Sequence, residues 1–150
     1  MHSGITAALG FLAAVLWFDL MFDVQIVAHR RDPVVPEDTI QSIAMYYRRV
    51  TTDASPMGRL VAVVMIVLIG LLVWQTVADG TAVWVSAVSL VGAGAAIVLA
   101  IGRVVPNAVR LGARTDSLVA QSGLARGIFR DHVVFLALIL AVLIVQLVAG

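Results

Sequence analysis

The chain has 150 residues, of which 61% are hydrophobic and only 13% are charged, and its formal net charge is +1. Soluble globular domains carry about a quarter charged residues, so this composition indicates an integral membrane protein. The absence of cysteine excludes disulfides, thiolate zinc sites and cysteine nucleophiles.

Four segments are long and apolar enough to cross a bilayer, which takes about 20 residues for a hydrocarbon core of about 30 Å. They are residues 5–28, 59–77, 83–105 and 133–149. The first lacks a basic leader and a small-residue cleavage site, so we interpret it as a retained helix. The sequence "ADG" at 78–80 predicts a tight turn between antiparallel neighbours. The predicted fold is all-α: a polytopic membrane protein with one domain, residues 1–150, folded as an antiparallel four-helix transmembrane bundle.

Residues 29–58 and 106–132 are predicted as the two long loops. Within the first, residues 36–49 have a helical pattern that begins with acidic residues and ends with arginines. One face of that pattern is apolar, which predicts a short interfacial helix that lies along the membrane surface or packs under the bundle. Its members are Ile40, Ile43, Ala44 and Tyr47. The second loop also has helical spacing and could extend the third and fourth helices.

All ten basic residues are arginine, and five fall in each long loop or at its boundary. They are Arg30, Arg31, Arg48, Arg49 and Arg59 in the first group, and Arg103, Arg110, Arg114, Arg126 and Arg130 in the second. The positive-inside rule places both loops in the cytoplasm and both termini outside, in a multi-pass protein of the plasma membrane. Acidic residues are interleaved with the arginines, so we expect no nucleic-acid partner.

Two aspartates interrupt the first span in the stretch "LWFDLMFDVQ", residues 16–25. Asp19 and Asp23 are four residues apart, so they share one helix face near the cytoplasmic boundary. An ionised carboxylate in lipid costs about 2.5 kcal/mol or more near the bilayer centre, so both should face the bundle. Side chains expected at the same depth are Arg59, Arg103, Asn107 and His132. The sequence therefore predicts a buried Asp/Arg cluster that also includes His132 and Asn107.

Several roles for this cluster are open from the sequence. The aspartates could pair with Arg59 and Arg103 and set the helix register, or share a proton or cation. Asp19, Asp23 and His132 have metal-ligating atoms, but no metal-binding spacing is present, and no metal is predicted. His132 could also serve as a general base beside a lipophilic pocket.

Small residues at four-residue spacing lie on the third span, at Gly92, Ala96 and Ala100. Such residues let transmembrane helices approach closely. They could serve contacts within the bundle, or form a face for a homo-oligomer or a larger membrane complex.

The segments "VVPNAVRL" and "ARGIFRDHVVF" resemble the last half of small four-helix membrane proteins of the anthrone-oxygenase-like kind. The matching positions are Pro106, Asn107, Arg126 and His132. The resemblance implies cofactor-free oxidation of an aromatic substrate in some members and no known activity in many.

Two functions are therefore expected from the sequence. One is a non-enzymatic accessory or oligomer-forming subunit in the lipid bilayer, whose cluster should be fully paired. The alternative is a small membrane enzyme or binding protein for a lipophilic molecule, with Asp19, Asp23 and His132 at the site and an apolar pocket beside Asp19 and His132. No cofactor can be named from the sequence.

Overall fold

The computed structural model describes residues 2–78 and 82–149, and these residues form helices joined by short turns, with no strand among them. The helices are, in chain order, α1 (His2–Asp23), continued by the 3₁₀ helix η1 (Val24–His29); α2 (Glu37–Arg48), continued by the π-helical turn η2 (Arg49–Asp53); α3 (Ser55–Ala78); α4 (Val83–Leu99), continued by the π-helical turn η3 (Ala100–Val104); α5 (Val105–Ala113); and α6 (Leu118–Ala149).

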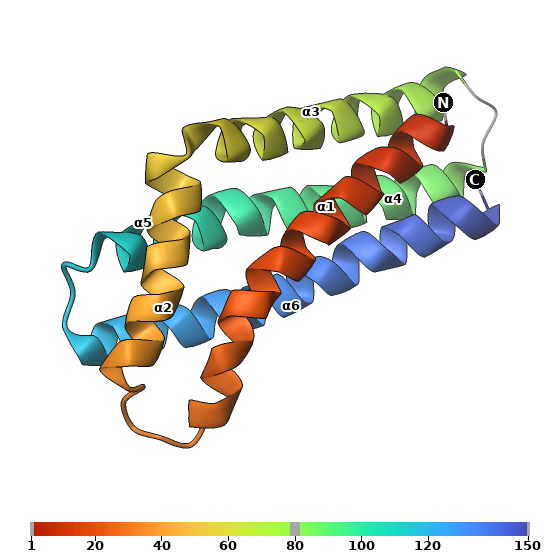
Figure 1. Ribbon diagram of the computed structural model, residues 1–150. Helices are drawn as coiled ribbons and strands as arrows, with labels where there is room; N and C mark the ends of the chain where they lie inside the picture. Colours follow the sequence, from red (N-terminus) through yellow and green to blue (C-terminus); the bar gives the residue numbers. More distant parts are fainter. Residues whose placement is uncertain (1, 79–81, 150) are drawn as a thin grey trace.

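Within the described residues, four helical runs are long and apolar enough to span a membrane, so the protein is a multi-pass membrane protein with the predicted four-helix bundle. They cover His2–His29, Pro56–Val77, Val83–Ala113 and Leu118–Ala149. Figure 1 shows both chain termini at one end of the bundle, which we call the terminal end. The helices α2 and α5 lie at the opposite end, which we call the cap end. The turn expected at 78–80 falls mainly on residues 79–81, which lie outside the described residues.

The last spanning helix starts much earlier than the predicted residue 133, in the way that the helical spacing of the second loop allowed. α6 begins at Leu118, so the expected loop 106–132 is mostly helical, and His132 lies inside α6 instead of at its start. Burial of Leu111, Ala125 and Ile128 in the cap explains the difference, because packing stabilises segments that hydropathy alone does not select. At about 1.5 Å per residue α6 is about 48 Å long, which exceeds the thickness of the hydrocarbon core.

The third spanning helix continues past its predicted end because Pro106 is accommodated inside it. Proline has no N–H to donate to the carbonyl four residues earlier, at Gly102. The helix widens into η3 directly before this point, and such π-helical turns absorb a missing hydrogen bond. The chain then resumes α-helical geometry in α5 and carries its buried face into the cap.

The short helix predicted at 36–49 is α2, and its predicted face is buried. Ile40, Ile43, Ala44 and Tyr47 are all 2% exposed or less. This face packs against α5 and α6, so α2 crosses the cap end of the bundle and covers it (Figure 1). Of the two predicted placements, the one under the bundle is therefore correct.

Two hydrophobic cores result, one in the bundle and one in the cap. The bundle core joins residues of all four spans, such as Leu9, Leu68, Ala96 and Ile139. The cap core is formed chiefly by Ile26, Val35, Ile40, Ile43, Tyr47, Leu111 and Ile128. The residues between these two cores form the candidate site.

We expect Gly112→Ala to lower the free energy of unfolding by about 1–3 kcal/mol, the range for overpacked contacts. A Cβ atom at Gly112 would lie 2.8 Å from the backbone nitrogen of Arg48, so α2 and α5 would have to separate. The measurement is denaturant unfolding in detergent, monitored by circular dichroism.

Gly94→Ala is the matched control, because a Cβ atom at Gly94 meets nothing within 4 Å. Equal losses of stability in the two variants would contradict the close approach of α2 to α5.

Candidate functional site

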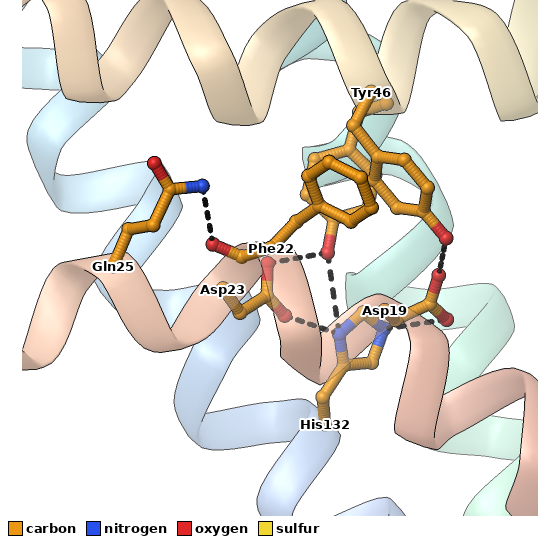
Figure 2. A network of polar contacts seen from close by, with 7 residues as sticks. Asp19, Phe22, Asp23, Gln25, Tyr46 and His132 are labelled. Carbon is orange, nitrogen blue, oxygen red and sulfur yellow. Dashed lines mark hydrogen bonds and ion pairs between the residues drawn. The ribbon is translucent and has the colours of Figure 1, made fainter.

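His132 of α6 lies between two carboxylates of α1. Its Nδ1 is 2.7 Å from Oδ2 of Asp23, and its Nε2 is 3.8 Å from Oδ2 of Asp19. The two aspartates share one face of α1 because they are one helical turn apart. Figure 2 shows the imidazole ring between them, with one ring nitrogen directed at each carboxylate.

Two consecutive tyrosines of α2 supply the other donors. The hydroxyl of Tyr46 donates to Oδ1 of Asp19, and the hydroxyl of Tyr47 donates to Oδ1 of Asp23, both at 2.6 Å. The ring of Phe22 stacks on Tyr46 with centroids 4.0 Å apart and an interplanar angle of 9°. The cap helix is therefore tied to the first spanning helix by two hydrogen bonds to carboxylates and one ring stack.

Burial divides the network into an inner and an outer half. Asp23, Tyr47 and His132 are 2% exposed or less, and both oxygens of Asp23 accept a hydrogen bond. The side chain of Asp19 is 16% exposed. Asp23 is thus fully engaged by the protein, whereas Asp19 retains an accessible carboxylate.

The described members of this network are two carboxyl groups, two phenols and one imidazole, with no arginine among them. Burial, together with the neighbouring aspartates, raises the pKa of Tyr46 and of Tyr47, so both phenols stay neutral donors at physiological pH. The partly exposed carboxyl group of Asp19 can bond to a donor on a ligand.

The contact with Asp23 also determines which ring nitrogen of His132 can accept a proton or a hydrogen bond. When Nδ1 donates its proton to Asp23, the neutral ring presents the lone pair of Nε2 on its other side. At 3.8 Å, Asp19 leaves that nitrogen without a close hydrogen bond. His132 can therefore accept a proton or a hydrogen bond at Nε2.

An apolar pocket of about 160 Å³ adjoins the outer half of the network. Asp19, Tyr46, Tyr47 and His132 form its polar wall. The rest of the lining is mostly apolar and comes from α1, η2, α3, η3, α5 and α6, with Leu16, Val61, Met65, Ala100 and Phe135 among its members. The pocket thus lies between the two cores, with α2 covering it at the cap end.

A second hollow, lined by α3 and by residues of α4 and η3, adjoins this pocket on the side of the outer surface of the bundle. It shares Gly58, Val61, Met65, Ala100 and Val105 with the pocket. Its outer lining includes Ile66 and Ile101, which are 72% and 67% exposed. Because these residues belong to membrane-spanning helices, this second hollow lies on the surface expected to face lipid, next to the pocket.

The structure brings together three of the six predicted site residues, Asp19, Asp23 and His132, and places the other three elsewhere. Arg59 is exposed on α3 and makes no ion pair with another described residue. Arg103 contacts Asp131 instead, with Nε 3.1 Å from Oδ2. Asn107 lines a different hollow between α5 and α6.

Of the roles left open by the sequence, the pairing of Asp19 and Asp23 with Arg59 and Arg103 is therefore wrong for the described residues. Arginines at a membrane boundary can extend their guanidinium groups toward water. In this protein the tyrosines of α2 form the hydrogen bonds to the carboxyl groups instead.

From the sequence, Tyr47 is predicted as part of the apolar face of the short helix, and the hydrogen bonds of Tyr46 and Tyr47 to the aspartates are not predicted. One signal was available: the two tyrosines are adjacent on a helix that returns to the bundle end where the aspartates lie. Phenols are donors that a buried carboxylate can use in place of an arginine. Depth along the helix is the same for both kinds of donor, so it does not distinguish a phenol from a guanidinium group.

A separate polar cluster joins the spans nearer the terminal end. Gln75 of α3 and Gln146 of α6 exchange two amide hydrogen bonds, of 3.2 and 3.0 Å, and Gln146 also donates to Ser89 of α4. These amides hold three helices together by satisfying one another. No described residues arrange three His, Asp or Glu side chains to hold a metal ion.

Comparison with protein-family models, with curated proteins and with solved structures finds no match for this chain. The resemblance to anthrone-oxygenase-like proteins therefore stays a prediction. Of its four matching positions, His132 belongs to the site described above, whereas Asn107 and Arg126 line the hollow between α5 and α6.

We expect Tyr47→Phe to lower the free energy of unfolding by about 1.5–3 kcal/mol, the range for a hydrogen bond to a charged group. The variant leaves Oδ1 of the buried Asp23 without its donor. Tyr46→Phe is the matched control, because Asp19 is partly exposed and water can replace the phenol. Denaturant unfolding in detergent compares them, and an equal effect of both variants would contradict the division into inner and outer halves.

Proposed function

We propose that this protein binds a small lipophilic molecule inside the membrane, with a polar group of the molecule directed at Asp19 and His132. The observation that carries the proposal is the apolar pocket whose polar wall is formed by these two side chains. Ligand sites are commonly apolar cavities with a few convergent polar groups of this kind.

The size of the pocket limits the ligand. An apolar cavity of about 150 Å³ holds one benzene-sized ring, so a volume of about 160 Å³ suits one ring or the end of a longer chain. Asp19 can accept a hydrogen bond, and Nε2 of His132 can accept one or donate one when protonated. A ring that carries a hydroxyl or amino group matches these features.

Access from the bilayer supports the same proposal. The hollow between α3 and α4 is apolar and shares its inner residues with the pocket. A lipophilic molecule dissolved in lipid could enter by this route without crossing water. His132, oriented by Asp23, would then be placed to exchange a proton with the bound molecule.

The other predicted function, an accessory or oligomer-forming subunit, has less support. Ala96 and Ala100 are buried within the chain, and a Cβ atom at Gly92 would lie 2.5 Å from the side chain of Val142. These small residues therefore serve contacts inside the bundle. The side chain of Asp19 is also partly exposed and lines the pocket, whereas a purely structural cluster should be fully paired.

The test is native mass spectrometry of gently solubilised protein, together with thermal unfolding in the presence of p-cresol or toluene. We expect a bound small molecule in the wild type, and stabilisation by p-cresol that exceeds stabilisation by toluene because the phenol can donate to Asp19. Gly58→Leu should abolish both effects, since Gly58 lines the pocket and a Cβ atom there meets nothing closer than 3.9 Å.

Gly70→Leu is the matched control, because Gly70 lies on the same helix α3 and a Cβ atom there meets nothing within 4 Å. The proposal fails if neither molecule stabilises the wild type, or if Gly58→Leu and Gly70→Leu behave alike.

We also propose that the cap end faces the cytoplasm in the cell membrane, because the two segments that carry all ten arginines adjoin that end. The cysteine-free chain permits single-cysteine labelling. A membrane-impermeant maleimide should label Ser3→Cys on intact cells, and Gln41→Cys only after the membrane is opened; both wild-type residues are exposed. The reverse pattern would invert the orientation.

A further inference from the structure

Four arginines line a hollow between α5 and α6 that shares no residue with the apolar pocket. We call it the basic hollow, and its volume is about 640 Å³. Its polar lining consists of Arg103, Asn107, Arg110, Arg126 and Arg130. The first three follow one face of η3 and α5 at spacings of four and three residues, and the last two are four residues apart on α6.

Positive charge exceeds negative charge in the basic hollow. Arg110 makes two hydrogen bonds to Asp116, and Arg103 and Arg130 contact Asp131 at 3.1 and 3.7 Å. Arg126 uses one nitrogen for the carbonyl oxygens of His29 and Asp32, and its Nε is buried without a hydrogen-bond partner among the described residues. Four arginines thus meet two carboxylates, which leaves two positive charges uncompensated.

The depth of these arginines matches the boundary of a bilayer. Arg103 follows the start of α4 at Val83 by 20 residues, and Arg130 precedes the end of α6 at Ala149 by 19 residues. At about 1.5 Å per residue, both lie about 30 Å from the terminal end, which equals the hydrocarbon thickness. Arg110 and Arg126 lie further toward the cap end, at the depth expected of lipid headgroups.

The floor of the basic hollow is kept free of side chains by two glycines of α6. Gly123 and Gly127 are one turn apart, and a Cβ atom at either meets nothing within 4 Å. Glycine has a poor helix propensity, so its use here is not explained by helix formation. Packing within the chain does not require it either. The open space between the arginines is available to a ligand.

We infer that the basic hollow binds the phosphate group of an anionic phospholipid. Guanidinium groups suit phosphate because they offer pairs of donors in a planar fork. Basic hollows between transmembrane helices at the membrane boundary are typical sites for anionic headgroups. The depth of the arginines favours a lipid over free phosphate as the source of that group.

The test compares lipid retention by native mass spectrometry after extraction from vesicles of phosphatidylcholine mixed with phosphatidylglycerol. The wild type should retain phosphatidylglycerol in preference to phosphatidylcholine. Arg126→Gln combined with Arg130→Gln should weaken this retention roughly 10- to 30-fold, as expected for the loss of two interfacial arginines. Arg30→Gln combined with Arg59→Gln removes the same charge from exposed positions outside the basic hollow and should have little effect.

Gly127→Leu tests the site without any change in charge. It should fill the floor of the basic hollow and reduce retention, whereas Gly94→Leu, at an open helical position on α4, should not. A comparison of Gly127→Leu with Gly94→Leu therefore tests lipid binding in the basic hollow even if the double arginine variant fails to fold.

Three outcomes would overturn the inference. The first is equal retention of the two lipids by the wild type, and the second is an equal loss of retention in the two double arginine variants. The third is displacement of phosphatidylglycerol by inorganic phosphate at similar concentration, which would identify a site for the free anion. None of these outcomes bears on the p-cresol experiment, because the two sites share no residue.

Discussion

The burial of Asp23 inside a membrane-spanning helix is the constraint on which much of this structure depends. A carboxylate that is 1% exposed must receive hydrogen bonds from the protein, because neither water nor lipid can supply them there. One donor comes from Tyr47 on α2 and the other from His132 on α6. Satisfying this one side chain therefore requires the cap helix and the last spanning helix to meet α1 at the same depth.

The same contacts create the pocket. Because α2 must reach α1 with its tyrosines, it crosses the cap end and covers the space between the bundle core and the cap core. Asp19 and His132 then line an apolar pocket that adjoins a second hollow on the outer surface of the bundle. The same arrangement of helices satisfies the buried Asp23 and leaves Asp19 partly exposed in the pocket. The stability of the fold and the proposed binding site therefore depend on the same contacts.

The arginines act separately from this network. They surround the cap end, where they contact carboxylates near the membrane boundary or extend toward water, and four of them line the basic hollow. A protein of this size thus has two polar regions of opposite character at nearly the same depth. One is acidic, enclosed and beside an apolar pocket; the other is basic, open and at the level of lipid headgroups.

Composition and hydropathy by themselves determined the all-α class, the four spans, the antiparallel order and the short helix at 36–49, because each depends on local pattern. The inward direction of Asp19 and Asp23 also followed from the sequence, since lipid penalises a charge. Tertiary structure alone decided that Tyr46 and Tyr47 bind the aspartates and that Arg59 and Arg103 do not. It also decided that α6 begins at Leu118, because cap packing stabilises that segment. Depth along a helix can be counted from a sequence, but the direction in which a long side chain leaves the helix depends on neighbours that are distant in the chain.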